Sequence, residues 1–496
     1  MTHRSLTAAG RRWAVAGIAA ILLTACGGSD STAPTSSAAT APTTAAPTTD
    51  APTTDAPTTD APTTDGVATT EVDVAAATTK MVPDDYDTIQ AAVDAAAPGD
   101  LILIKPGTYN EAVTVETDNL TIRGLDRNEV VLDGQLELDN GIRVVGASGV
   151  AVENMTATNY TSNGFFWTGV DGYRGSYLTA YRTGDYGVYA FDSVTGQLDH
   201  IYAAGSPDAG IYIGECYPCD AVIDNIVSEH NGLGYSGTNS GGNLLIVNSI
   251  FRFNRAGLVP NSGSYELCYP GRQTTIIGNI VYSNNQADTP AIDVALLAMG
   301  NGILSAGSVL NDIERNLVYD HDKSGIGLVP FLEEDANDVV PSPEQWSLTC
   351  EESKQLDPVI PDGPLLWESQ QTRVIGNVVS DSRQADLINA SVSMAEADLG
   401  NCFSDNTFTS TAPNNLETLA PCDGTGSGDW ADGKYNILSW LEDNPPPSVD
   451  WKTATLPPLQ PQDNMPDAAT APARPATDVP YKVDLDAITV PTKPAG

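Results

Sequence analysis

Two of the four histidines in the chain stand beside aspartate, and these residue types could transfer protons or hold a cation. One group is the pair Asp199 and His200, and the other is the run Asp320, His321 and Asp322. An imidazole beside a carboxylate can act as a general base, and aspartate oxygens suit Ca²⁺. A solvated turn accounts for the same residues without chemistry. We treat them as candidate catalytic residues and assign no metal or cofactor, Ca²⁺ being the cation that the carboxylates would accept.

A second set of candidates lies in three segments that interrupt a regular repeat, at residues 215–220, 260–272 and 331–370. These segments combine aromatic rings with carboxylates and one arginine. Such a mixture suits sugar binding, because rings pack on pyranose faces and carboxylates accept hydrogen bonds from hydroxyls. The candidate ligand-binding residues are Tyr217, Tyr269, Arg272 and Trp346. The alternative is that these side chains bury the small cores of their own loops.

Six cysteines besides Cys26 indicate disulfides, because an even number in an exported chain is typical of paired cysteines. The spacing of Cys216 and Cys219 also fits a zinc knuckle or a redox pair, although no second such pair follows it. We favour a local Cys216–Cys219 bond. Cys402–Cys422 comes next, and Cys268–Cys350 is left by elimination.

The elements that must position these residues follow from a repeated phrase, an asparagine flanked by aliphatic residues. Its clearest copies begin at Asp224, Val247, Gly278, Arg315 and Gly376. The spacing has a floor of about 22 residues with a variable surplus, which predicts a solenoid whose coils each hold about three short strands. Further asparagines, Asn231, Asn254 and Asn285, recur six residues after the anchors. We interpret them as a structural ladder of turn residues.

The segment before the repeat predicts a cap. Residues 87–90 resemble a capping box, and a helical apolar pattern follows until Pro98-Gly99. Tyr86-Asp-Thr-Ile-Gln-Ala-Ala-Val93 and Pro98-Gly-Asp-Leu-Ile-Leu-Ile-Lys-Pro-Gly-Thr-Tyr109, with the asparagine repeats, resemble proteins of the pectin-lyase-like superfamily. The resemblance implies an all-β, right-handed parallel β-helix with an N-terminal capping helix and long edge loops. It implies no single activity, because members include lyases, hydrolases, epimerases and surface proteins without known chemistry.

The ends of the chain divide it into four parts. Residues 1–25 form a signal peptide, and Leu23-Thr24-Ala25-Cys26 resembles a bacterial lipobox, which implies lipidation of Cys26. Residues 26–80 are a stalk of Ala-Pro-Thr-Thr-Asp repeats, predicted to be disordered because it has little apolar surface to bury. Residues 81–425 form the β-helix domain. The proline-rich segment 426–496 is expected to lie along that domain.

The formal net charge of −41 argues against nucleic acid and anionic membrane surfaces as partners. The predicted membrane contact is instead the lipid on Cys26, which would hold an exported protein on the outward side of the cell membrane. An extracellular polysaccharide is the remaining candidate partner.

Two functions stay open. The first is a surface protein that binds polysaccharide or an envelope component without catalysis. The second is a carbohydrate-active enzyme such as a lyase, hydrolase or epimerase. The catalytic motifs of the superfamily's polygalacturonases, pectate lyases and alginate epimerases are absent or reduced to fragments, which favours the first function. The elaborate loops with their cysteines keep the second function open.

Overall fold

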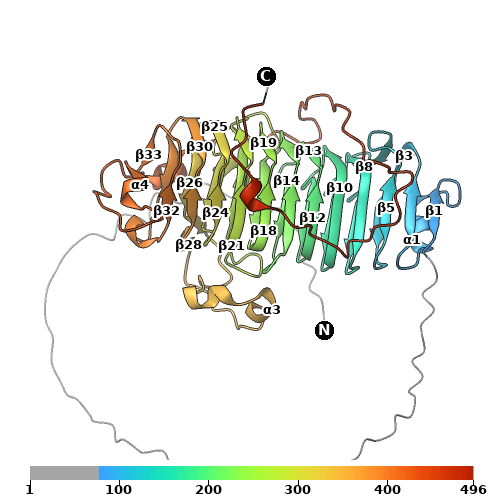
Figure 1. Ribbon diagram of the computed structural model, residues 1–496, viewed down its shortest axis with the longest axis horizontal. Coiled ribbons are helices and arrows are strands. Elements are labelled where there is room, and N and C mark those ends of the chain that lie inside the picture. Colours follow the sequence, from blue (N-terminus) through green and yellow to red (C-terminus); the bar gives the residue numbers. More distant parts are fainter. Residues whose placement is uncertain (1–76, 495–496) are drawn as a thin grey trace, which may run out of the picture. The chain divides into compact units, whose positions relative to one another are not determined.

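The structure is a computed structural model that describes residues 77–494. The predicted signal peptide, Cys26 and most of the predicted stalk lie outside this range. The described chain winds into a stack of coils, with the strands of successive coils paired in parallel (Figure 1). The first strand begins at Thr79, so the β-helix starts inside the predicted stalk, two residues before the predicted boundary.

Each regular coil contributes one strand to each of three faces. Face 1 contains β1 (Thr79–Val82), β2 (Leu101–Ile104), β5 (Thr121–Gly124), β8 (Val150–Thr158), β10 (Asp171–Tyr181), β12 (Val194–Asp199), β15 (Ala221–Asp224), β18 (Gly241–Val247), β21 (Arg272–Ile277), β24 (Asp312–Glu314), β29 (Arg373–Ile375) and β32 (Cys402–Ser404). Face 2 contains β3 (Gly107–Tyr109), β6 (Val130–Asp133), β13 (Tyr202–Ala204), β16 (Val227–Glu229), β19 (Ile250–Arg252), β22 (Ile280–Tyr282), β25 (Leu317–His321) and β30 (Val378–Ser382). The long strands β8 and β10 pair in both faces and join them into one sheet.

Face 3 is a separate sheet. It contains β4 (Val113–Val115), β7 (Ile142–Val145), β9 (Phe165–Thr168), β11 (Val188–Phe191), β14 (Ala209–Gly214), β17 (Leu233–Thr238), β20 (Ala256–Asn261), β23 (Ile303–Ala306), β26 (Ser324–Val329), β31 (Ala385–Asn389) and β33 (Thr411–Ala412). Successive side chains of a strand alternate between the interior and the exterior of the coil. One interior row along this face runs through Phe165, Val188, Ile211, Tyr235 and Leu258, all fully buried. Such rows form the main hydrophobic core.

The interior of one turn carries an asparagine ladder. The side-chain amide of Asn279 donates to the side-chain oxygen of Asn316 at 3.0 Å, and the same bond recurs from Asn316 to Asn377 and from Asn377 to Asn406. Glu417 accepts the last bond and closes the ladder. The asparagines of the two earlier repeat copies stand elsewhere. The strand register places Asn225 and Asn248 one residue before the ladder position, with positive φ. The repeated asparagine therefore marks two neighbouring positions with different roles.

A second ladder runs along the turn that follows face 2. Asn231 bonds Asn254 at 3.1 Å, and Asn254 bonds Asn284 at 3.0 Å. The predicted ladder is thus present, but its third member is Asn284 and not Asn285. Both ladders give buried amides their partners, which is why polar residues are tolerated inside the coils.

Short helices close both ends of the stack. Helix α1 (Ile89–Asp94) buries Ile89, Ala92 and Val93 at the N-terminal end, as expected for a cap. Its N-cap is Thr88, whose hydroxyl accepts from the amide of Ala91, one residue later than the capping box predicted from the sequence. Helix α4 (Leu416–Leu419) packs beside β32 at the other end, where the Cys402–Cys422 disulfide joins the strand to the segment that follows the helix.

Three insertions, at residues 215–220, 262–271 and 331–370, follow strands of face 3, and together we call them the wall. The longest, residues 331–370, contains β27 (Phe331–Glu333), η2 (Pro343–Ser347), α3 (Cys350–Ser353) and β28 (Leu365–Trp367), and we call it the arm. The arm projects from the body in Figure 1. A further insertion between β22 and β23 contains α2 (Asp293–Leu297). The 3-10 helices η3 (Glu396–Asp398), η4 (Ile437–Glu442) and η5 (Leu485–Ala487) lie in the C-terminal third of the chain.

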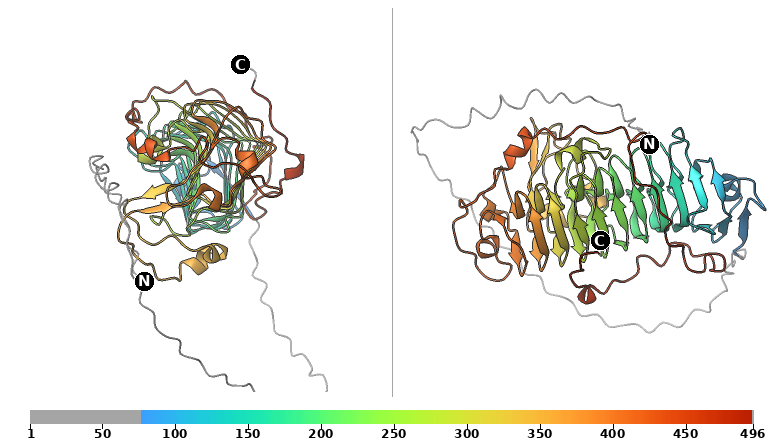
Figure 2. Two further views of the ribbon diagram at one scale, coloured as in Figure 1. Left: turned by 90° about the vertical axis from the view of Figure 1, so that its left-hand side faces the viewer. Right: turned by 90° about the horizontal axis from the view of Figure 1, so that it is seen from above.

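The C-terminal segment lies along the body, as expected (Figure 2). Arginines hold it by its backbone carbonyls: Arg255 donates to Pro446 at 2.6 Å, Arg182 to Trp451 at 2.8 Å, and Arg123 to Ala471 at 2.7 Å. The segment therefore runs toward the N-terminal coils. It then returns along face 1, where Ile488 packs on Val222, Val247 and Ile277. No helix within residues 77–494 is long and apolar enough to span a membrane.

Candidate functional site

Aromatic residues form a row on the exterior of face 3. Phe166 pairs in register with Tyr189, and Tyr189 pairs with Tyr212, each 23 residues further along the chain. Because their strand neighbours fill the core, alternation turns these three rings outward. The ring centroids of Phe166 and Tyr189 lie 4.8 Å apart, as do those of Tyr189 and Tyr212. Residues that are one coil apart in sequence therefore lie side by side on neighbouring strands, and their rings stack.

Two more rings extend this row. Tyr186, in the turn before β11, lies 4.3 Å from Tyr189 with the two ring planes 3° apart, and Phe191 lies 5.7 Å from Tyr189. We call the five residues Phe166, Tyr186, Tyr189, Phe191 and Tyr212 the aromatic platform. All except Tyr212 are partly exposed.

Four carboxyl groups influence the platform, and we call them the platform acids. Asp185 and Asp208 occupy equivalent turns before β11 and β14, Glu215 follows β14, and Glu266 comes from the insertion at residues 262–271. Burial, followed by the neighbouring charge of Asp185, raises the pKa of Asp208 to about 8. Burial, followed by Glu215 and Asp208, raises the pKa of Glu266 to about 8, and burial raises that of Asp185 to about 6. These carboxyls can therefore carry a proton near neutral pH.

Tyrosine hydroxyls connect the platform to the acids. The Tyr212 hydroxyl donates to the carboxylate of Glu266 at 2.5 Å. Burial, followed by Glu266, holds the pKa of Tyr212 well above its usual value, and that of Tyr186 is raised by burial and then by Asp208. Both hydroxyls therefore remain protonated, and that of Tyr212 already donates its hydrogen bond to Glu266.

Two insertions border the platform. Tyr186 packs against the apolar cluster that contains Ala295 of α2. At the other ends of the strands, Lys354 of the arm contacts Asp192, directly after β11, at 2.7 Å. The arm, which belongs to the wall, thus borders an aromatic surface that was not predicted, and the insertion that contains α2 borders it on the other side.

The four predicted ligand-binding residues lie in or beside the wall, where Arg272 contacts Tyr217. Arg272 is 1% exposed, stacks 3.6 Å from the ring of Tyr217, and donates to the carbonyls of Cys268, Pro270 and Leu348. Trp346 is 5% exposed, and its indole nitrogen donates to the carbonyl of Pro341 at 3.3 Å. Tyr269 is half-buried and donates to Asp338 at 2.5 Å.

The prediction that Tyr217, Tyr269, Arg272 and Trp346 line an open binding groove is therefore wrong. The two most polar contacts of a sugar site, a free guanidinium and a free indole N–H, are both used by backbone carbonyls within the wall. The insertions are long enough to need small cores of their own, and these residues supply them.

Asp199 and His200 are brought together on the exterior of face 1. The imidazole Nδ1 and the carboxylate are 2.7 Å apart, and the His200 ring stacks on Tyr177 at 4.3 Å. Burial alone would raise the pKa of Asp199, but hydrogen bonds from His200, Gln197 and Ser176 outweigh it and hold the pKa below its usual value. The carboxylate is fully engaged by these donors. A catalytic role for the pair stays a prediction.

The run Asp320, His321 and Asp322 is split by strand alternation. His321 is 2% exposed and points inside, where its Nε2 lies 3.4 Å from the side-chain amide of Asn284. Burial lowers the pKa of His321 to about 3, so the imidazole is neutral. Asp320 and Asp322 lie at the surface, where Asp320 accepts from Ser283 at 2.6 Å. The prediction of a joint catalytic or cation site is wrong, because neighbours on a strand face opposite sides.

The three predicted disulfides are present, namely Cys216–Cys219, Cys268–Cys350 and Cys402–Cys422. The zinc-knuckle alternative for Cys216 and Cys219 is therefore not needed. Within residues 77–494, no group of three or more histidine, cysteine, aspartate or glutamate side chains is arranged to hold a metal ion.

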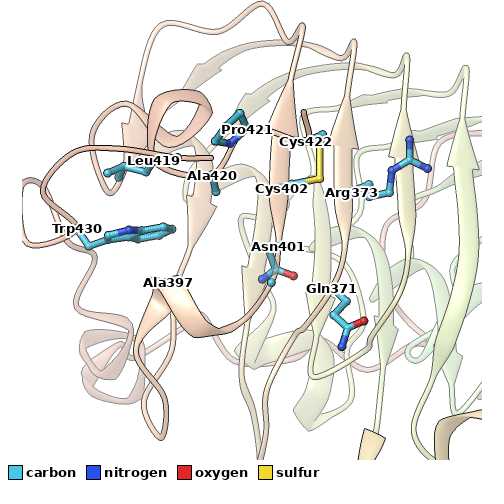
Figure 3. A pocket seen from close by; sticks show the side chains of 12 residues that line it. Gln371, Arg373, Ala397, Asn401, Cys402, Leu419, Ala420, Pro421, Cys422 and Trp430 are labelled. Atoms are coloured by element: carbon cyan, nitrogen blue, oxygen red, sulfur yellow. A yellow bond between two sulfur atoms is a disulfide. The ribbon is translucent and has the colours of Figure 1, made fainter. Parts of the chain in front are cut away.

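A surface hollow lies at the C-terminal end of the stack (Figure 3). Trp430, Arg373, Gln371 and the Cys402–Cys422 disulfide line it, with no carboxyl or imidazole among its lining residues. Arg373 is already paired with Asp312 at 3.0 Å. The hollow thus lacks the groups for acid–base chemistry, in contrast to the platform.

The signal for the platform was present in the sequence. The strand Gly187-Val-Tyr-Ala-Phe191 alternates small or aliphatic residues with aromatic ones, and aromatic residues recur 23 positions before and after Tyr189. Glu266 carries no such signal, because it is 54 residues from Tyr212 and reaches it through an insertion.

Comparisons with known proteins agree with the fold. Residues 140–329 match a family model described as "Right handed beta helix region". Together with the parallel three-faced stack, this match identifies the fold as a right-handed parallel β-helix. A search of curated proteins gave no match.

Several solved structures are similar at low identity. The A-module of mannuronan C-5 epimerase AlgE4 from Azotobacter vinelandii is 16% identical, with 70% of this chain and 96% of that chain covered and a TM-score of 0.47. A rhamnogalacturonan lyase is 12% identical, covering 71% and 89%, with a TM-score of 0.44. An alginate lyase from Paenibacillus sp. str. FPU-7 is 14% identical, covering 66% and 99%, with a TM-score of 0.38. All three TM-scores are below 0.5, so no site residue or activity is transferred.

Proposed function

We propose that this protein binds polysaccharide through the aromatic platform on face 3. The observation that carries the proposal is the set of stacked, partly exposed rings centred on Tyr189. Flat apolar rings pack against pyranose faces, and protonated tyrosine hydroxyls and carboxyls beside them supply directional hydrogen bonds to sugar hydroxyls. A repeating coil also presents its rings at regular intervals, which suits a repeating polymer.

A pull-down of the purified chain with a panel of insoluble and immobilised polysaccharides tests the proposal. We expect at least one polysaccharide to retain the protein, and Tyr189→Ala to abolish most of that retention. Tyr319→Ala is the matched control, because Tyr319 also stacks on a neighbouring tyrosine, at 4.9 Å from Tyr282, but on face 2. Equal retention of both variants would contradict the assignment of the site.

A second candidate function is catalysis at the same place. It is favoured by the Tyr212–Glu266 hydrogen bond at 2.5 Å and by the raised pKa of Asp208 and Glu266, each about 8. A carboxyl that holds a proton near neutral pH can act as a general acid, and its neighbour can act as a general base.

Product formation separates the two functions. Retained polysaccharides are incubated with the protein and assayed for unsaturated sugars by absorbance and for new reducing ends. Products that disappear in Asp208→Asn and Glu266→Gln would establish the enzyme. Retention without products over extended incubation would leave the binding function alone.

Export and attachment through a lipid on Cys26 belong to the same proposal and rest on the lipobox-like Leu23-Thr24-Ala25-Cys26. A lipid followed by an extended stalk would place the platform away from the membrane and toward extracellular glycans. Labelling cells with a fatty-acid probe tests this directly. We expect label on the wild-type protein and none on Cys26→Ser, which should also leave the membrane fraction.

A further inference from the structure

The platform acids lack the positive partners that buried carboxylates usually have. Asp208 is 6% exposed, and no donor among the described residues hydrogen-bonds its carboxylate within ordinary range, although the Tyr186 hydroxyl is close enough to lower its pKa. The cationic side chain nearest to any platform acid is Lys354, 4.0 Å from Glu215 and engaged more closely with Asp192 at 2.7 Å. No arginine or lysine contributes to the pKa of Asp208 or Glu266.

Carboxylates buried in this way are costly when they ionise. Protonation is one remedy, which the raised pKa values of Asp208 and Glu266 reflect. A ligand that brings its own positive charge is the other remedy, because it restores the missing partner.

The aromatic rings favour the same kind of ligand. Tyr186 and Tyr189 are parallel, and Tyr212 is inclined by 58° to both. The faces of tyrosine rings attract cations through their quadrupole, and such attraction strengthens when the site is partly desolvated. The rings and the neighbouring carboxyl groups that lack close cationic partners are therefore both favourable to an ammonium group.

On another face of the stack, exterior aromatic residues and acids are already paired with cationic side chains of this chain. On face 2, Arg252 bonds Glu229 at 2.5 Å and donates to the Tyr282 hydroxyl at 2.8 Å, and Lys493 lies 4.1 Å from the Tyr319 ring. The same residue types thus have close cationic partners on face 2, whereas Asp208 and Glu266 on face 3 have none among the described residues.

We infer that the aromatic platform and its acids take an amine-bearing sugar chain, of the glucosamine type, in preference to an uncharged or a uronate chain. This inference rests on the proposed polysaccharide-binding function. The amine would lie between the rings and Asp208, and the pyranose would pack on Tyr189. A uronate brings no positive charge to the platform acids, and it would meet a like charge whenever one of them ionises.

Three hexasaccharides of equal length test the inference by calorimetric titration of the full chain: glucosamine, N-acetylglucosamine and galacturonate oligomers. At low ionic strength and a pH at which the amines are charged, we expect the glucosamine oligomer to bind at least about tenfold more tightly than the N-acetylated one. Galacturonate should not bind. Added salt should weaken the glucosamine complex selectively.

Variants locate the effect. Asp208→Asn, which preserves shape, should reduce glucosamine affinity about tenfold, with Glu266→Gln as a second variant and the exposed Asp381→Asn as control. Equal affinity for the glucosamine and N-acetylglucosamine oligomers, no binding of the glucosamine oligomer, or an unchanged affinity in both acid variants would overturn the inference. The proposed function would survive these outcomes if another glycan still bound in a Tyr189-dependent manner, and it would fail without one.

Discussion

The wall and the aromatic platform are built from the same residue types and differ in the charge balance around their buried ionisable groups. In the wall, Arg272 donates to three backbone carbonyls and stacks on the face of Tyr217, and its Nε has no partner among the described residues. At the platform, Asp208 is almost as buried and has no cationic partner among the described residues. The comparison teaches that composition alone marks neither region as functional. What distinguishes them is which charged group is buried and what surrounds it.

The largest expected effect comes from breaking the wall. Arg272→Ala removes three hydrogen bonds from a charged group and leaves three buried carbonyls unpaired, so we expect the free energy of unfolding to fall by about 3 kcal/mol or more. Chemical denaturation measures this change. Arg383→Ala is the control, because Arg383 is 74% exposed and its loss should cost less than about 0.5 kcal/mol. A similar result for both variants would show that the wall is not held by Arg272.

The next effect concerns the platform and should appear in binding instead of stability. Tyr189→Ala removes the ring that contacts all the other platform rings, and we expect at least about tenfold weaker binding of the retained polysaccharide. Its melting temperature should change less than that of Arg272→Ala. A binding loss of equal size in the control Tyr319→Ala would remove the distinction between the two faces.

A smaller effect is expected in the pH dependence of stability. The pKa of Asp208 is about 8 in the folded protein and is raised from 3.8, so the folded state holds more protons than the unfolded state between these values. The free energy of unfolding should therefore fall as the pH rises from about 4 to about 8. Asp208→Asn should lessen the drop in melting temperature between pH 5 and pH 8. Asp381→Asn, at an exposed acid, should leave the drop unchanged.

The smallest effect is expected at His321. Its imidazole is neutral and lies in line with the Asn231–Asn254–Asn284 ladder, so His321→Asn should extend the ladder and cost less than about 1 kcal/mol. Polysaccharide binding should stay unchanged. His321→Leu, which removes the imidazole nitrogen beside the Asn284 amide and leaves that amide its bond to the Phe251 carbonyl, should be less stable than His321→Asn in the same denaturation series. A loss of binding in His321→Asn would return this residue to the list of site residues.

The fold could be predicted much further than the site. Asn316 and its equivalents recur once per coil because each buried amide needs an acceptor in the neighbouring coil. This requirement is visible in the sequence as a repeat. Even so, Asn225 and Asn248 belong to copies of the same repeated phrase but lie in the turn beside the ladder. An asparagine suits both positions, once for its hydrogen bonds and once for its tolerance of positive φ, so residue type alone could not separate them.

The candidate site was predicted in the wrong place for a similar reason. Trp346 and Arg272 are typical of sugar sites, but they are equally typical of a small loop core, and only burial distinguishes the two uses. His321 was placed with Asp320 and Asp322 because they are adjacent in sequence. Alternation along β25 separates them in space.

The sequence by itself determined the solenoid, because coil length, ladder residues and inward aliphatic rows all follow from a local period that each coil must repeat. It also determined that Phe166, Tyr189 and Tyr212 would stack, since a spacing of one coil becomes a spacing of one strand. The tertiary structure alone decided that Glu266 would meet Tyr212 and that Asp208 would be buried without a cationic partner among the described residues. Those contacts depend on how insertions of irregular length fold back on the stack. The sequence repeat carries no information about that folding, because the insertions lie outside the repeat.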